Sequence, residues 1–261
     1  MEKGDKDEIK KEKLPRVYSM KDLMNIVYQV FEFTGIWFKI LGCPEKGATW
    51  FIWGGSGNGK STACAILAYL LSSFGKVLYI ALEEQKGKSI RSKLLKAGFK
   101  KDSKNFQLLP KESYDQLIQR LHKRNSPDII FIDSLQYWGI SYKQYQKLKE
   151  LFPDKTFVFV SHAKGKEPKG GVADSIHYDA AIKIFVEGGR ITVKHRFEGG
   201  GGEMDVIPEL AEKYWNSSGG PDYKLLFELL LRFVRDNKMQ PYLSAFIEKE
   251  GYNINELRVE L

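Results

Sequence analysis

Long apolar runs are missing from this sequence. No stretch approaches the ~18 to 20 consecutive apolar residues that a membrane-spanning helix needs. The N-terminal stretch MEKGDKDEIKKEK is rich in charge and lacks the apolar segment of a secretory signal. We therefore expect a protein that works in the cytoplasm and makes no contact with a membrane.

Cysteine is also scarce, because Cys43 and Cys64 are the only two in the chain of 261 residues. Cys64 stands in an apolar helical pattern, and neither cysteine belongs to a cluster with the spacing of a metal site. The sequence therefore predicts no disulfide framework and no zinc finger, which fits a reducing compartment.

Acidic residues do not balance the basic ones. The chain has 41 Lys and Arg against 33 Asp and Glu, giving a net charge of +8. Such an excess favours a polyanionic partner without requiring one. The charged tail at 1–16 is expected to be disordered, and its six basic and five acidic side chains do not account for the excess.

Apolar patterns alternate between helix and strand along the rest of the chain. The pattern turns helical from Val17, and apolar residues from Leu23 to Phe33 recur roughly every three to four positions, which predicts a helix near the start. Strand-like runs follow at 50–53, 77–82, 106–109, 129–132, 157–160, 182–186 and 191–193, with helical segments at 62–73, 89–97, 114–122 and 142–152. This order predicts an α/β fold with a mostly parallel central sheet flanked by helices. The last two strands are close enough to form a terminal β-hairpin.

Glycine is concentrated in two places. The four glycines at 199–202 indicate either a flexible loop or a domain boundary. We divide the chain into a tail at 1–16, a core at 17–200, a Gly-rich linker and connector at 201–220, and a helical C-terminal extension at 221–261.

The second glycine-rich stretch matches the phosphate-binding pattern G-x-x-x-x-G-K-[ST]. It reads Gly54, Gly55, Ser56, Gly57, Asn58, Gly59, Lys60 and Ser61. It follows a strand and precedes a helix that continues through Thr62, so backbone N–H groups and the helix N-terminus can meet phosphate oxygens. We expect ATP here, with Lys60 on the β- and γ-phosphates, Ser61 on Mg²⁺ and Thr62 also in contact with the nucleotide. The alternative is a glycine-rich turn with a chance lysine.

Carboxylates follow two of the predicted strands, at the edge where open α/β sheets bind ligands. Glu83 and Glu84 end one of them, and we assign Glu83 to activate the attacking water, although Glu84 is not excluded. Asp133 ends another in the Walker B arrangement and would hold Mg²⁺ together with Ser61. The alternatives are a solvated loop start and a helix-capping aspartate.

A polar pair, Ser161 and His162, ends the strand at 157–160. In this position a polar side chain is suited to sense the γ-phosphate and relay its presence to the following loop. The alternative is a structural histidine.

Together these motifs resemble the RecA-like ATPases, most closely the ATPase core of the RadA (Sms) family, with the DnaB- and RepA-type hexameric helicase motors as relatives. The resemblance spans about 33–200. It rests on Gly54–Ser61, Tyr79–Gln85, Asp133–Gln136, Ser161–Lys164, Lys169–Gly171, Asp179 and Lys194–Phe197. His195 stands where the family commonly has asparagine, and the segment after Asp133 is short.

The resemblance implies a ring or filament of identical subunits with ATP at the interfaces between them. It further implies that Lys194 and Arg196 project into a neighbour's site and neutralise charge on the γ-phosphate. Both residues share one face of a strand, so both can reach one target. The alternative is a pair of solvated bases at a strand end.

Two basic stretches are candidates for contact with nucleic acid. Lys164, Lys166 and Lys169 stand among glycines after the sensor strand, where RecA-like proteins place a DNA-contacting loop. The stretch at 86–104 has eight basic residues and is more simply a solvated surface. Neither carries obvious base-reading groups, so sequence-independent binding of single-stranded DNA is the better expectation.

The sequence thus predicts a Mg-ATP-dependent ATPase of the RecA/RadA type, stimulated by single-stranded DNA and acting in recombination, repair or annealing. One alternative is a hexameric replicative helicase with the same core. Another is an ATP-gated switch whose partner is a protein.

Overall fold

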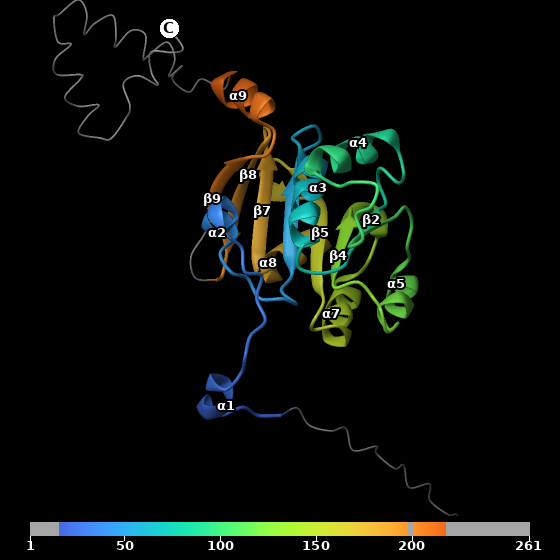
Figure 1. The fold of residues 1–261 in the computed structure, drawn as a ribbon, viewed down its shortest axis with the longest axis vertical. Coiled ribbons are helices and arrows are strands. Elements are labelled where there is room, and N and C mark those ends of the chain that lie inside the picture. The colour runs from blue at the N-terminus through green and yellow to red at the C-terminus, as the bar shows by residue number, and fades with distance from the viewer. Residues whose placement is uncertain (1–15, 198–200, 218–261) are drawn as a thin grey trace, which may run out of the picture.

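The computed structural model describes residues 16–197 and 201–217 (Figure 1). The expected disorder at 1–15 and the helical extension at 221–261 lie outside the described residues. Within the described ranges, no helix combines the length and apolar character needed to cross a membrane.

A central sheet organises the fold. Its strands are β1 (Trp50–Gly54), β2 (Val77–Ala81), β3 (Phe106–Leu109), β4 (Ile129–Asp133), β5 (Thr156–Lys164), β6 (Glu167–Pro168), β7 (Ile182–Glu187), β8 (Arg190–His195) and β9 (Gly202–Asp205). The strand order is β3-β2-β4-β5-β1-β7-β8-β9, and β6 pairs with β5. The strands from β3 to β7 in this order are parallel, whereas β8 and β9 are antiparallel. The predicted mostly parallel sheet with a terminal hairpin is confirmed.

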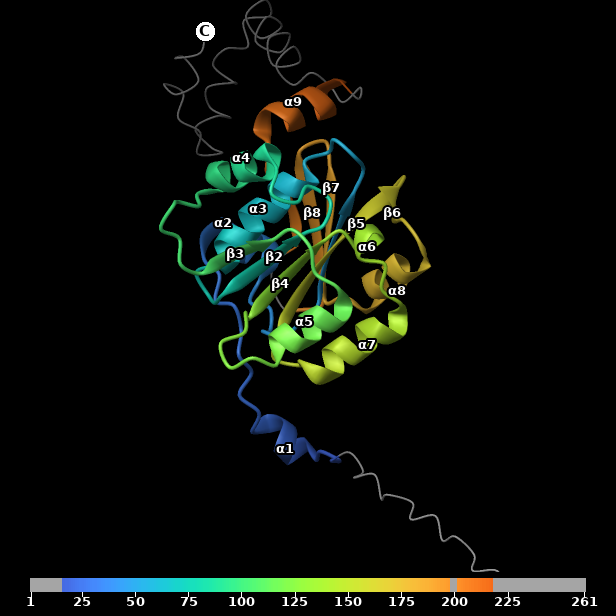
Figure 2. The ribbon, with the colours of Figure 1, turned by 90° about the vertical axis from the view of Figure 1, so that its right-hand side faces the viewer.

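Helices cover both faces of this sheet. The helices of the described residues are α1 (Met20–Met24), which does not pack on the sheet, α2 (Gly35–Leu41), α3 (Lys60–Leu71), α4 (Lys88–Ala97), α5 (Tyr114–Leu121), α6 (Leu135–Trp138), α7 (Tyr142–Leu151), α8 (Gly171–Asp179) and α9 (Pro208–Ser217). One apolar cluster packs α2, α3 and α4 on one face. A second packs α5, α7 and α8 on the other, as Figure 2 shows. The carboxyl ends of the parallel strands lie together at one edge of the sheet.

The burial of each strand follows its place in the sheet. Every residue of β1, β2 and β4 is buried, because helices cover these strands on both faces. In β7 buried and half-buried residues alternate, and in β8 half-buried and exposed residues alternate with buried ones. One face of the β7–β8 pair is therefore partly open to solvent.

The predicted N-terminal helix is wrong over most of its length. Only α1 forms, and none of its residues is buried. Phe31 and Phe33 belong to an extended segment, in which the Phe31 N–H donates to the carbonyl of Pro44 at 2.8 Å. Both rings are buried while Glu32 between them is exposed, which is the two-residue period of an extended chain.

The four-glycine stretch ends inside the sheet. Gly202 is the first residue of β9, which pairs with β8 in antiparallel register. Residues assigned to the linker at 201–220 therefore include a strand of the same sheet and the helix α9.

Candidate nucleotide site

The phosphate loop joins β1 to α3 at the carboxyl edge of the sheet, as the motif predicts. Gly57 and Gly59 have φ of 79° and 94°, in the left-handed region that glycine adopts without strain. A side chain at Gly54 would collide with the carbonyl oxygen of Val186 on β7. The backbone conformation at Gly57 and Gly59 and the close contact at Gly54 thus explain why these positions of the motif are glycine.

The N-terminus of α3 is suited to bind an anion. Gly59 occupies its N-cap position, so no side chain accepts hydrogen bonds from the first-turn N–H groups, and no acidic residue lies in that turn. Lys60 is the first helical residue, followed by Ser61 and Thr62. Free N–H groups, the helix dipole and a lysine together favour phosphate at this end.

Asn58 holds the phosphate loop against the turn between β7 and β8. Its side-chain oxygen accepts from the N–H of Gly188 at 2.9 Å, and its carbonyl accepts from the N–H of Gly189 at 3.1 Å. Both glycines form the turn between β7 and β8. Asn58 therefore joins the phosphate loop to the terminal hairpin, and its side-chain oxygen is already engaged there.

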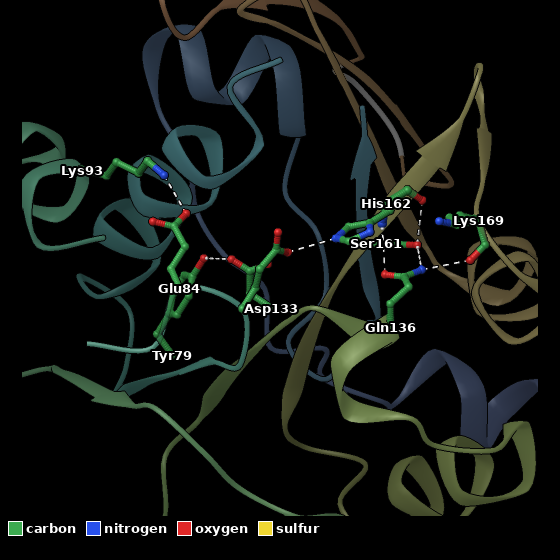
Figure 3. A network of polar contacts seen from close by, with 9 residues as sticks. Tyr79, Glu84, Lys93, Asp133, Gln136, Ser161, His162 and Lys169 are labelled. Atoms are coloured by element: carbon green, nitrogen blue, oxygen red, sulfur yellow. Dashed lines mark hydrogen bonds and ion pairs between the residues drawn. The ribbon is translucent and has the colours of Figure 1, made fainter. Parts of the chain in front are cut away.

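Asp133 ends β4 and is buried, with 5% of its surface exposed. The hydroxyl of Tyr79 donates to its carboxylate at 2.7 Å (Figure 3). Burial raises the pKa of Asp133, and the negative charge of Glu83 adds to the rise, whereas the contact with Tyr79 and the charge of Lys60 oppose it. A cation bound beside Asp133 would relieve this burial cost.

The two glutamates after β2 point to different partners. Oε2 of Glu83 lies 2.9 Å from Nε2 of His162. Ser161 and His162 lie within β5 and do not end it, because the strand continues to Lys164 in its pairing with β6. Oε1 of Glu84 accepts from Nζ of Lys93 on α4 at 2.6 Å. The carboxylate nearest the sensor strand is thus Glu83, while Glu84 is held in an ion pair.

Oxygen ligands of the kind that Mg²⁺ prefers are present near the phosphate loop. Burial opposes the charged form of Glu84, but Lys93, Ser61 and Ser89 around its carboxylate outweigh burial and lower its pKa. Oε2 of Glu84 is buried without a hydrogen-bond partner. The hydroxyl of Ser61 and the carboxylate of Asp133 would hold Mg²⁺, which usually takes only one or two protein oxygens beside phosphates and water.

Gln136 links β5 to the start of α8. Its Nε2 donates to Oγ of Ser161 at 2.8 Å and to the carbonyl of Lys169 at 2.9 Å. Its Oε1 accepts from the N–H of His162 at 3.1 Å (Figure 3). Ser161 and His162 therefore share one amide side chain with the segment that leads into α8.

The predicted lysine loop is a short β-hairpin. Ala163 and Lys164 on β5 pair with Pro168 and Glu167 on β6. Lys164, Lys166 and Lys169 are all exposed. The indole N–H of Trp53 donates to the carbonyl of Lys166 at 2.8 Å, which ties the hairpin tip to β1.

Lys194 and Arg196 lie away from the phosphate loop of their own chain. Gly54 is level with Val186 on β7, whereas Lys183, the cross-strand partner of Lys194, is level with Phe51. Three residues along a strand span roughly 10 Å. The two bases therefore stand toward the opposite edge of the sheet, and both are exposed.

A cleft of about 640 Å³ opens beside the phosphate loop. Its lining includes Thr62 and Ile66 from α3, Ser89 and Lys93 from α4, and Ile207 and Pro208 before and within α9. The cleft begins one residue after Ser61 and is within the size range of small-molecule sites. It offers room for a group attached to phosphates bound at the loop.

Three side chains of this network could not be predicted from the sequence. Tyr79 stands in an apolar strand, where its hydroxyl gives no sign that it reaches Asp133. Gln136 follows the Walker B strand, but nothing local shows that it contacts Lys169. Lys93 lies nine residues after Glu84, on a helix whose docking brings them together.

Comparison with solved structures finds similarity at the level of the fold. A KaiC-like protein of the hyperthermophilic archaeon Pyrococcus horikoshii matches with a TM-score of 0.52 and 18% identity, over 66% of this chain and 90% of that chain. An ATPase from the type III secretion system of pathogenic bacteria has a TM-score of 0.44 and 12% identity, over 61% of this chain and 57% of that chain. No family model matches the sequence, and no curated protein does. The first likeness shows a RecA-like core, while the closer resemblance to the RadA family stays a prediction.

Proposed function

We propose that this chain binds Mg-ATP at the phosphate loop and hydrolyses it. The observation that carries the proposal is the meeting of three features at one edge of the sheet. They are the uncapped N-terminus of α3 with Lys60, the buried Asp133, and the exposed Glu83. The cleft beside Thr62 supports a nucleoside attached to the phosphates.

Each residue has a role that suits its surroundings. Lys60 and the N–H groups of α3 bind phosphate oxygens, and Ser61 and Asp133 hold Mg²⁺. When bound, Mg²⁺ neutralises charge on the β- and γ-phosphates. Glu83 orients the attacking water and accepts its proton, a role suited to a carboxylate outside the ion pair that holds Glu84.

The proposed nucleic-acid partner is single-stranded DNA, contacted by Lys164, Lys166 and Lys169. All three are exposed, and none forms an ion pair within the described part of the chain. Gln136 contacts both His162 and Lys169, which offers a path from the γ-phosphate to the hairpin. We assign the activity to DNA recombination, repair or annealing on this basis.

The proposed active unit is a homo-oligomer with ATP at the interfaces between subunits. Lys194 and Arg196 are too far along the sheet to serve the phosphate loop of their own chain. Their exposure supports a role in a neighbour's site, where they would act on the γ-phosphate.

The test is the steady-state rate of phosphate release from Mg-ATP without DNA, with single strands and with duplex. Lys60→Ala serves as the blank. Hydrolysis that rises with single strands supports the proposal, and a forked duplex then separates it from a helicase motor. A rate indifferent to DNA favours a switch with a protein partner, and no release above the blank contradicts the ATPase itself.

A further inference from the structure

Three cations gather on the open face of the β7–β8 pair. Lys183 on β7 lies directly opposite Lys194 on β8 in the antiparallel register. Arg196 lies one residue beyond the end of β8, and its guanidinium donates to the carbonyl of Tyr178, as Lys183 does. Lys194 and Arg196 are the pair that the family resemblance implies, and the register adds Lys183.

Lys183 and Arg196 meet at one backbone oxygen. The carbonyl of Tyr178 accepts from Nη2 of Arg196 at 2.9 Å and from Nζ of Lys183 at 3.3 Å. Tyr178 stands in the last turn of α8, where unpaired carbonyls and the helix dipole attract positive charge. The end of α8 thus brings the two cations together.

The positive charge of this cluster is only partly offset, because Asp179 is the nearby acidic group that acts on Lys183 and Arg196. None of the three cations forms an ion pair within the described ranges. The nearby Asp179 already accepts from Lys149 at 2.6 Å and from Tyr145. Like charges directly opposite on two strands are destabilising. Burial lowers the pKa of Lys183, and the charges of Arg196 and Lys194 lower it further, while the charge of Asp179 opposes them.

The cluster is open to a second molecule. Lys194 and Arg196 are exposed, Lys183 is half-buried, and Tyr178 has 80% of its surface exposed. The cluster also lies toward the edge of the sheet opposite its own phosphate loop. A ligand bound here therefore comes from outside the chain.

We propose that Lys183 joins Lys194 and Arg196 in binding the terminal phosphates of a nucleotide held by a second copy of this chain. The inference rests on the proposed ATPase function. Cations gathered around one carbonyl oxygen match a compact group with several negative charges. A nucleic-acid backbone spreads its charge along the strand and is the poorer match.

The test compares Lys183→Met, Lys183→Arg and the control Lys147→Met, an exposed lysine on α7 outside the cluster. We expect Lys183→Met to bind nucleotide like the unmodified chain, with kcat lowered about tenfold, because its own phosphate loop is intact. Lys183→Arg keeps the positive charge and retains most of kcat. Lys147→Met leaves kcat unchanged.

Mixing subunits shows whether Lys183 acts on a neighbour. Lys60→Ala chains have an inactive phosphate loop but intact cations, so they can supply Lys183 to the sites of Lys183→Met chains. We expect an equal mixture of the two variants to hydrolyse ATP faster than the average of each alone. A mixture no faster than that average would overturn the role in trans.

Two other outcomes overturn the inference. If Lys183→Met has an unchanged kcat while the unmodified chain hydrolyses ATP, Lys183 has no part in the reaction and the proposed function stands. If Lys183→Met instead weakens only the binding of single-stranded DNA, the cluster is a nucleic-acid site. An unmodified chain without hydrolysis contradicts the proposed function first and removes the inference with it.

Discussion

The carboxylate of Glu83 lies 2.9 Å from Nε2 of His162, across 79 positions of sequence. The contact joins the segment after β2 to β5, and Asp133 ends β4, which lies between these two strands. The residue proposed to activate water and the residue proposed to sense the γ-phosphate are therefore direct neighbours. This separates Glu83 from Glu84, whose carboxylate is held by Lys93.

Glu83→Gln should bind ATP with nearly unchanged affinity and lose about 10²- to 10⁴-fold in kcat, the usual contribution of a general base. Glu84→Gln is the matched variant one residue away. It loses the ion pair with Lys93 and should retain much more of kcat. Single-turnover hydrolysis and nucleotide binding measure the two effects separately. Activity in Glu83→Gln together with inactivity in Glu84→Gln would reverse the assignment.

Gln136→Ala should uncouple hydrolysis from DNA. The substitution removes the amide that contacts Ser161, His162 and Lys169, while the phosphate loop remains intact. We expect the basal rate to change less than about threefold and the stimulation by single strands to be lost. Gln144→Ala on α7 is the control for removing a glutamine side chain outside this network. Full stimulation in Gln136→Ala would contradict the proposed path.

Asp133→Asn should abolish hydrolysis and stabilise the chain in the absence of nucleotide. Burial raises the pKa of Asp133 above its ordinary value of 3.8, so the folded chain binds this proton more tightly than the unfolded chain does. The stability from this group is therefore highest below pH 3.8 and falls as the pH rises through the raised pKa. An amide of the same shape carries no charge and avoids this loss at neutral pH.

Thermal unfolding at pH 7 without nucleotide measures this effect. We expect Asp133→Asn to raise Tm by about 2 to 4 °C, which corresponds to about 1 kcal/mol in a domain of this size. Asp154→Asn, at an exposed aspartate, should leave Tm unchanged. A lower Tm in Asp133→Asn would show that the carboxylate stabilises the empty site.

Replacing Lys164, Lys166 and Lys169 with alanine should weaken single-strand binding and its salt dependence. Each lost phosphate contact lowers the slope of log K against log salt by about 0.7. The matched control replaces Lys100, Lys101 and Lys104, exposed lysines of the second basic stretch. Titrations at several salt concentrations compare the two triple variants. An equal loss of slope in both would make the hairpin an ordinary basic surface.

The sheet was predictable because its strands are short apolar runs between helical patterns. Strands β1, β2 and β4 are buried on both faces, so their sequences are apolar throughout. The phosphate loop was equally predictable, because Gly57 and Gly59 adopt left-handed backbone conformations that favour glycine. The N-terminal helix was wrongly predicted, because Phe31 and Phe33 fit the apolar spacing of a helix as well as that of an extended chain. The hydrogen bond from Phe31 to the carbonyl of Pro44, which holds the segment extended, is not visible in the sequence.

The contacts between side chains of the site depend on distant parts of the chain. The partner of Glu84 lies on α4, and the partner of Asp133 lies on β2. The register of β7 against β8, which places Lys183 opposite Lys194, is not visible in the sequence and is what suggests a role for Lys183. Local patterns predict the ends of strands where such residues stand, whereas pairing and helix docking decide which of them meet.

The most direct measurement is steady-state phosphate release from Mg-ATP by the full chain, with Lys60→Ala as the blank and with single-stranded DNA added or omitted. The account predicts release above the blank, faster with single strands and abolished in Glu83→Gln. Release no greater than that of Lys60→Ala, with or without DNA, would contradict it.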